Sequence, residues 1–298
     1  MTAHTRIPLP ADVVEYISQI FQNIDKNVSS RLDRMPTLHE EHLDLSFIET
    51  VTSVQGPHIT PSGTVVDIDV HFVGSGRHWR VWEIADIGFI VNFRRGSELL
   101  RTKIVLLQSK RIYPRETEFV EVEGMSHTGG FGSLMRPSPL IGQGPRAFQT
   151  DETCVYKALH VGNEQWSAIV QYEEAFKIPV HYMLYHPSNL PAQAMIPVTV
   201  PIKISDAPIT VGTRIISSNN VRNRCADFPV DHTPSFIELS DAMGAVGASL
   251  TDFVVSGVLS CTEGYITDDW ENDSGVWRVF NARNAPIWAA IRMDIHLP

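Results

Sequence analysis

Four residues within the first 110 of the chain have the types and spacing of a site that cleaves phosphodiesters. Asp86 opens one apolar segment, and Gln108 and Lys110 close the next one. Carboxylate and amide oxygens are ligands that Mg²⁺ accepts. A lysine beside them can stabilise charge on an attacking water or a phosphate. These residue types predict a Mg²⁺ (or Mn²⁺) site with Asp86 and Gln108 as ligands and Lys110 beside it.

The segment that carries these residues has the pattern of a β-hairpin. Two apolar runs, 88–93 and 104–108, are joined by a polar turn around Gly96. Gln108 and Lys110 project from the same face of the second strand, because alternate residues of a strand share a face. The hairpin therefore brings the amide and the lysine to one end of two adjacent strands.

Two helices are predicted before the hairpin. Apolar residues recur at three- and four-residue spacing over residues 10–34. Thr37 and Glu40 have the form of a capping box that opens a second helix. Glu41 lies on the inner stripe of that helix, so we expect its carboxylate to complete the metal site. The residues that mark the stripe are Leu38, Leu45, Ile48 and Thr52.

The remaining elements follow from hydrophobic periodicity. Residues 118–151 are long, irregular and rich in glycine, which indicates a surface loop that serves as a lid or an oligomer contact. The predicted elements are a strand at 65–73, a helix at 164–176, a buried strand at 180–185, short strands within 202–216 and one or two helices at 236–255.

The order helix, three strands, helix, strand, with Asp86 and the triplet Gln108-Ser109-Lys110, resembles the PD-(D/E)xK restriction-endonuclease-like superfamily. The closer likeness is to its Q-x-K branch of Mrr-like restriction nucleases and phage-defence effector nucleases. The resemblance covers roughly residues 10–190. It implies an α/β (α+β) fold with a mixed restriction-endonuclease-like sheet core and the activity of a Mg²⁺-dependent DNA endonuclease, with antiviral defence as the role of that branch. Asp86, Gln108 and Glu41 would be its metal ligands, and Lys110 would act beside them.

This chain departs from the family pattern in two places. No proline precedes Asp86, and a long insertion follows Lys110 before the next helix. We expect a nuclease-like domain over residues 1–195, with the insertion at about 118–155. Residues 196–298 would form a C-terminal α/β region with a regulatory or assembly role. A regulatory protein partner or a homo-oligomer would restrain such a nuclease in its host.

Charge is distributed unevenly along the chain. The net charge is −10, yet nine basic residues stand against three acidic ones between residues 77 and 115. This basic window is either a solvated hairpin face or a surface that holds the DNA backbone without reading sequence. The residues predicted to contact phosphate are Arg94, Arg95, Arg101, Lys103 and Arg111.

Two alternatives remain open at this stage. Asp86 and Lys110 could form a partly buried salt bridge without a catalytic role. The chain would then be a non-catalytic module that binds nucleic acid or a partner protein. Glu83 is either a second metal ligand or a charge at the strand edge, and Asp67 and Asp69 are either ligands or a solvated strand face.

Other classes of protein are disfavoured. Three widely spaced cysteines form neither a disulfide framework nor a zinc signature, which fits a reducing cytoplasm. His39 and His42 lie three residues apart, whereas the zinc peptidase motif needs four. The sequence has no G-x-S-x-G motif, no signal peptide and no apolar run long enough to cross a bilayer. We therefore expect a cytoplasmic protein without a membrane partner.

Overall fold

The protein is a mixed α/β structure built on a mixed sheet of many strands. It was described from a computed structural model. No helix among the described residues is long and apolar enough to cross a membrane. The residues described are 7–72, 84–119, 146–196, 204–267, 269, 272–280 and 287–298.

The helices begin and end largely where the periodicity of the sequence changes. A π-helical turn, Phe253–Val258, continues directly from the short helix α6. The helices are α1 (Ala11–Arg34), α2 (Glu40–Thr52), α3 (Glu164–Phe176), α4 (Ser218–Arg224), α5 (Phe236–Leu239), α6 (Leu250–Asp252) and α7 (Ser274–Phe280).

Most of the strands form one sheet in the order β1-β2-β13-β3-β4-β7-β10-β11, with β12 paired to β4. β3 and β4 are antiparallel, and β4 is parallel to β7. The strands of this sheet are β1 (Gly56–Ile59), β2 (Val65–Phe72), β3 (Ile87–Arg95), β4 (Glu98–Arg111), β7 (Val180–Tyr185), β10 (Arg214–Ser217), β11 (Ala248–Ser249), β12 (Tyr265–Thr267) and β13 (Ala289–Leu297).

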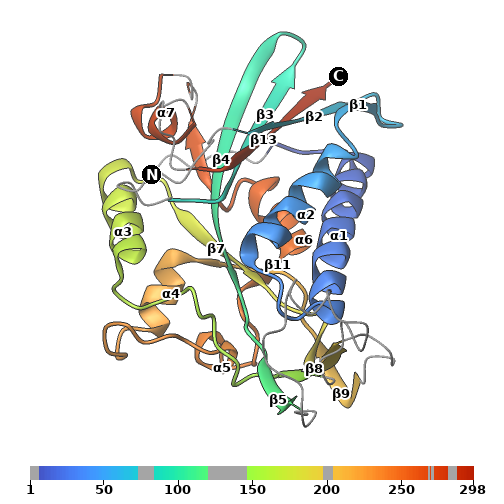
Figure 1. The fold of residues 1–298 in the computed structure, drawn as a ribbon. Coiled ribbons are helices and arrows are strands. Elements are labelled where there is room, and N and C mark those ends of the chain that lie inside the picture. Colours follow the sequence, from blue (N-terminus) through green and yellow to red (C-terminus); the bar gives the residue numbers. More distant parts are fainter. Residues whose placement is uncertain are drawn as a thin grey trace, which may run out of the picture.

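A smaller sheet lies at one end of the molecule, in the order β5-β6-β8-β9 (Figure 1). It begins four residues after β4 ends, so it lies near the end of β4 that carries Gln108 and Lys110. Its strands are β5 (Arg115–Phe119), β6 (Arg146–Thr150), β8 (Asn189–Ile196) and β9 (Ile204–Thr210).

Helices cover both faces of the large sheet (Figure 1). α1 and α2, drawn in blue, pack on one face with the π-helical turn. α3, α4, α5 and α7 pack on the other face. Each face therefore buries its own apolar core, and strands such as β7 are buried along their whole length because they are covered on both sides.

The strongest periodic signals of the sequence are confirmed. The long N-terminal helix, the strand at 65–72, the helix at 164–176 and the strand at 180–185 all occur within a residue of the predicted bounds. The β3–β4 hairpin is also present, with strands longer than the apolar runs alone indicated. These elements occur in the predicted order, and β13 is an additional strand inserted between β2 and β3.

Two helix predictions are confirmed only in part. The second helix begins at Glu40 and has His39 as its N-cap, without a side-chain cap, so the capping box at Thr37 does not form. Its buried face is also rotated from the predicted stripe, because Leu45 is 40% exposed while Phe47 is fully buried. The segment 236–255 contains two short helices, α5 and α6, with the strand β11 between them, so the two-helix alternative is nearer to the structure than a single helix. α5 already ends at Leu239, and Gly247 has a left-handed backbone (φ 56°) directly before β11.

The C-terminal region shares the main sheet instead of forming a separate layer. β13 lies between β2 and β3, antiparallel to the first and parallel to the second. β10, β11 and β12 also belong to this sheet. The main sheet therefore contains strands from both sides of the predicted boundary at residue 195. Residues 1–195 alone lack β13, one of its central strands. Most of the predicted insertion, residues 120–145, lies outside the described residues.

Candidate functional site

Asp86 is held rigidly at the point where β3 begins. Its backbone N–H donates to Leu107 O at 2.8 Å, and its carbonyl accepts hydrogen bonds of 3.1 Å from the backbone of both Trp288 and Ala289. The Asp86 backbone is therefore bonded to β4 on one side and to the start of β13 on the other. Asp86 as a residue is partly exposed.

Gln108 and Ser109 both bond to one oxygen of the Asp86 carboxylate, Oδ2. The Gln108 Nε2 and the Ser109 backbone N–H both donate to Asp86 Oδ2, the latter at 2.6 Å. Gln108 is 2% exposed, and its Oε1 has no hydrogen-bond partner within the described part of the chain. A buried acceptor without a partner is uncommon and needs an explanation. The predicted pairing of Asp86 and Gln108 is thus present, and it leaves one amide oxygen unoccupied.

Glu40 takes the next backbone donor along the edge of β4. Its Oε1 accepts from the Arg111 backbone N–H at 3.0 Å. Since β3 pairing ends at Ile87 and Leu107, Asp86 and Glu40 occupy the side of β4 where a strand would otherwise continue. Burial raises the pKa of Glu40, and the charges of Lys110 and Arg111 oppose that effect.

A third carboxylate, Asp44, lies one helical turn after Glu40 and is wholly enclosed. Its Oδ1 accepts from the Ser109 hydroxyl at 2.5 Å and from the Tyr185 hydroxyl at 2.6 Å. Desolvation raises the pKa of Asp44 to about 7, against the lowering effect of these two hydrogen bonds. Asp44 therefore connects α2 to β4 and β7 behind the Asp86–Gln108 pair.

Lys110 is 4% exposed and supplies a positive charge among these carboxylates. Its charge favours the ionised forms of both Glu40 and Asp44. Gln108 and Lys110 leave β4 on the face opposite to Ser109, because side chains alternate along a strand. The structure thus pairs Asp86 with Gln108 and places Lys110 two residues further along β4. The carboxylates of Glu40 and Asp44, from α2, bond to neighbouring residues of the same strand.

Glu41 does not take the place expected for it. Its side chain is exposed, whereas Glu40 and Asp44 turn toward β4. Adjacent residues of a helix point about 100° apart, so an error of one residue in the stripe exchanges an inward carboxylate for an outward one. The spacing of Glu40, Asp44, Phe47 and Val51 is itself a helical face and would have identified the inward pair.

The residues predicted to contact phosphate fall into two groups. Lys103 and Arg111 are fully buried, so both are removed from the predicted phosphate-binding surface. Arg111 instead donates to the carbonyls of Leu38 and Pro36, the latter at 2.5 Å, and fixes the α1–α2 connection. Burial of the guanidinium lowers the pKa of Arg111 to about 10.

Arg94, Arg95 and Arg101 remain accessible, but at the far end of the hairpin. Arg95 is exposed, and Arg94 forms an ion pair of 3.6 Å with Asp294. Arg101 is seven residues from Gln108 along β4, or roughly 23 Å at the usual rise of a strand. These arginines therefore lie well away from Gln108.

The donor set at the end of β4 fits a hard divalent cation. Asp86 and Glu40 each use one carboxylate oxygen in the hydrogen bonds described above, and the Gln108 Oε1 is a buried acceptor without a donor. Such oxygens are the ligands that Mg²⁺ and Mn²⁺ bind. Within the described residues, no group of three or more His, Cys, Asp or Glu gathers as a metal site, so a cation held here would need the amide oxygen as well. Glu83, considered as a further ligand, lies outside the described residues.

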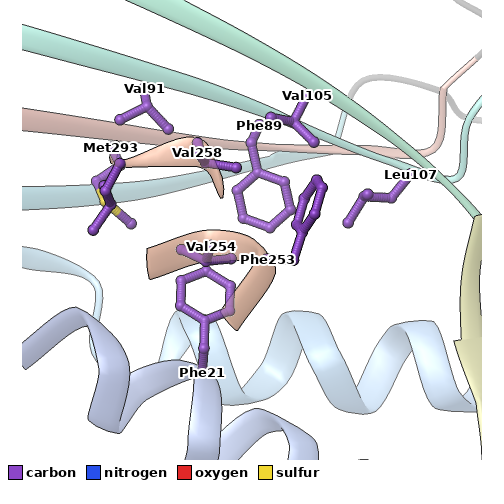
Figure 2. Close-up of a pocket in the computed structure, with 10 residues that line it drawn as sticks. Phe21, Phe89, Val91, Val105, Leu107, Phe253, Val254, Val258 and Met293 are labelled. Atoms are coloured by element: carbon purple, nitrogen blue, oxygen red, sulfur yellow. The ribbon is translucent and has the colours of Figure 1, made fainter. Parts of the chain in front are cut away.

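A second feature, a small pocket between the sheet and α1, offers no comparable chemistry. Figure 2 shows that it is enclosed by apolar side chains, among them Phe21, Phe89 and Phe253. All the residues that line it are apolar, so it has no side-chain donor or acceptor to orient a polar ligand. It is a packing gap in the core rather than a binding site.

Comparison with known proteins identified no relative of this chain. No family model, no curated protein and no solved structure matches the chain. Any inference about function must therefore be made from the site itself.

Proposed function

We propose that the protein is a Mg²⁺-dependent nuclease that hydrolyses phosphodiester bonds in DNA. The observation that carries the proposal is the buried Gln108 Oε1, which has no donor among the described residues and belongs to the amide that is bonded to the Asp86 carboxylate. Lys110, two residues further along β4, leaves the strand on the same face as Gln108. The resemblance of the motif to Q-x-K nucleases and the position of the motif on adjacent strands support the same activity. The hairpin followed by a parallel strand, β7, agrees with the restriction-endonuclease-like core that we propose for the fold.

Each residue has a distinct role in this proposal. Asp86, Gln108 and Glu40 would hold the cation through their oxygens. When bound, Mg²⁺ supplies positive charge that stabilises a phosphodiester under attack and makes a water more acidic. Lys110 would place its ammonium group beside the same phosphate and stabilise the negative charge that develops on it. Arg95 and Arg101 would contact the DNA backbone at a distance and without reading sequence.

The alternative is a non-catalytic module with the same fold. It is favoured by the small number of carboxylates, because no cluster of three metal-ligating acidic, His or Cys residues occurs among the described residues. In that case Asp86 and Glu40 would serve only to satisfy the backbone of β4. Both readings predict a stable fold, so metal binding and cleavage are the measurements that distinguish them.

The test is plasmid cleavage by the full chain with Mg²⁺, Mn²⁺ or EDTA, beside Asp86→Ala and Lys110→Ala proteins. Glu41→Gln is the matched control, since Glu41 is exposed on the same helix that carries Glu40. We expect metal-dependent cleavage that falls at least ~100-fold in both alanine variants and is unchanged in the control. Thermal unfolding of each variant should remain cooperative.

Calorimetric titration with Mn²⁺ provides the second measurement. The proposal expects one binding event in the native chain that is lost in Asp86→Ala. Absence of cleavage with any metal, together with absence of Mn²⁺ binding, would overturn the nuclease assignment and support the non-catalytic module.

A further inference from the structure

Asp44 occupies a position that the proposed mechanism does not use. It is fully enclosed between α2, β4 and β7, and a single oxygen, Oδ1, accepts from the hydroxyls of Ser109 and Tyr185. Ser109 is the middle residue of the triplet Gln108-Ser109-Lys110. A buried carboxylate bonded to the centre of that triplet can act on the site without touching a substrate.

Among the described residues, the end of β4 is paired with a strand on one side only. From Gln108 to Arg111 the strand pairs with β7 on one side, whereas β3 has already ended on the other. On that second side, the described partners of the backbone N–H groups of Ser109 and Arg111 are the carboxylates of Asp86 and Glu40. Two side chains therefore replace the missing strand.

This arrangement creates a conflict when the site is used. If Asp86 and Glu40 turn toward a cation, their hydrogen bonds to the β4 backbone weaken at the same time. The bonds from Ser109 and Tyr185 to Asp44 do not involve either ligand, so they can persist. Asp44 is the contact that can keep this part of β4 in place while the two edge carboxylates bind metal.

We propose that Asp44 is a positioning residue that braces the end of β4 through Ser109 and Tyr185 and so fixes the placement of Gln108 and Lys110. This role in catalysis rests on the nuclease function proposed above. The brace itself is a structural property that can be measured without substrate.

The chemistry of the brace separates two variants of Asp44. Since only Oδ1 is used, asparagine offers an equivalent acceptor to both hydroxyls, whereas alanine offers none. Asp44→Asn should therefore preserve the function of the brace and Asp44→Ala should abolish it. If Asp44 were instead a metal ligand or an essential charge, asparagine would fail as completely as alanine.

Amide hydrogen exchange of the full chain is the first measurement. In Asp44→Ala, exchange at residues 108–111 should rise at least ~10-fold, while the centre of β3 stays protected. Asp44→Asn should resemble the native chain. Ser109→Ala and Tyr185→Phe each remove one donor and should give intermediate increases, which keeps the test valid if Asp44→Ala folds poorly. Unchanged exchange in Ser109→Ala, Tyr185→Phe and Asp44→Ala would overturn the brace.

Steady-state cleavage with saturating Mn²⁺ is the second measurement. The proposal expects kcat to fall at least ~10-fold in Asp44→Ala with the KM for DNA unchanged, and recovery in Asp44→Asn. A loss in Asp44→Asn equal to that in Asp44→Ala, with normal exchange at residues 108–111, would overturn the positioning role in favour of a direct one. If the native chain cuts no DNA with any metal, the nuclease assignment fails, and the exchange data still decide whether the brace exists.

Discussion

Gln108 donates its side-chain amide to Asp86 across the β3–β4 hairpin, at the residue where β3 begins. The other atom of the same amide, the buried Oε1, has no hydrogen-bond partner among the described residues. The Gln108 amide therefore has a partner for its nitrogen and none there for its oxygen. A buried acceptor without a partner is costly, and in the proposed site a cation at Oε1 would remove that cost.

Gln108→Glu tests this reading of the pair. The variant replaces the N–H donor that faces Asp86 with a second carboxylate, and like charges at contact distance repel. Without divalent metal we expect the free energy of unfolding to fall by about 1–3 kcal/mol. Mn²⁺ should raise the melting temperature of the variant by more than it raises that of the native chain, because two carboxylates attract the cation more strongly.

Thermal unfolding in EDTA and in Mn²⁺ makes this comparison directly. Gln108→Leu is the control of similar size, which loses the donor without adding a charge and should show little response to metal. An equal Mn²⁺ shift in the native, Glu and Leu proteins would show that residue 108 does not face a cation.

Glu40 and Glu41 form a natural pair of test and control. Glu40 accepts from the backbone of Arg111 at 3.0 Å, whereas the side chain of Glu41 is exposed. Glu40→Gln retains a hydrogen-bond acceptor but removes the charge, so the fold should persist while Mn²⁺ affinity and cleavage both fall at least ~10-fold. Glu41→Gln should match the native chain in both.

The decisive result is which of the two variants, Glu40→Gln or Glu41→Gln, loses more Mn²⁺ affinity and cleavage. Calorimetry and plasmid cleavage on the same preparations establish it. A larger defect in Glu41→Gln than in Glu40→Gln would show that the helix carboxylate predicted from the sequence is the functional one and that Glu40 only satisfies the backbone.

Several elements of the fold can be predicted from local sequence patterns alone. Strong local periodicity was sufficient for α1, β2, α3 and β7, because each buries a regular face. The closeness of Asp86 and Gln108 at one end of the hairpin was also accessible, because both lie at the open end of the two strands. Their register was not, because a bulge at Phe93/Arg94 shifts the pairing by one residue from the one that the turn sets.

The parts that could not be predicted depend on contacts distant in sequence. β13 pairs with β2 and β3 across roughly 200 residues, and no local pattern specifies that insertion. Its alternation of Ile291, Met293 and Ile295 with polar residues is a readable strand signal, but its neighbours are set by the global packing. Lys103 and Arg111 are predicted as surface charges because buried cations are rare without partners. The structure buries both: Arg111 donates to the Leu38 and Pro36 carbonyls, whereas Lys103 Nζ has no hydrogen-bond partner among the described residues.

Arg95 and Arg111 should respond to substitution in opposite ways. Arg95 is exposed at the hairpin tip, so Arg95→Ala should leave stability unchanged, weaken DNA binding equally for all sequences and reduce the salt slope of binding by about 1. Arg111 is buried and bonded to the Leu38 and Pro36 carbonyls. Arg111→Ala should cost about 2–4 kcal/mol of stability.

Fluorescence anisotropy with labelled duplexes over a range of salt concentrations, and urea unfolding, provide the two readouts. A changed salt slope in Arg111→Ala at temperatures where the variant is folded would place Arg111 at the DNA interface after all. An unchanged slope in Arg95→Ala would remove the hairpin tip from that interface.

The raised pKa of Asp44 predicts a specific dependence of stability on pH. Between the ordinary carboxyl pKa of 3.8 and the native value of about 7, the folded chain keeps a proton that the unfolded chain releases. The free energy of unfolding therefore decreases as pH rises through this window, with a slope of at most about 1.4 kcal/mol per pH unit from this group. Glu40 raises the pKa further, while Lys110 and the hydroxyls of Ser109 and Tyr185 lower it.

Asp44→Asn isolates this contribution, because asparagine does not titrate. Urea unfolding of both proteins at pH 5, 6, 7 and 8 and at constant ionic strength gives the difference in stability at each pH. We expect the native chain to lose stability relative to Asp44→Asn from pH 5 to pH 7 and the difference to level off above the native pKa. A difference that is constant from pH 5 to pH 8, or that grows in favour of the native chain, would mean that Asp44 is ionised in the folded protein and that its burial is offset by cationic partners such as Lys110.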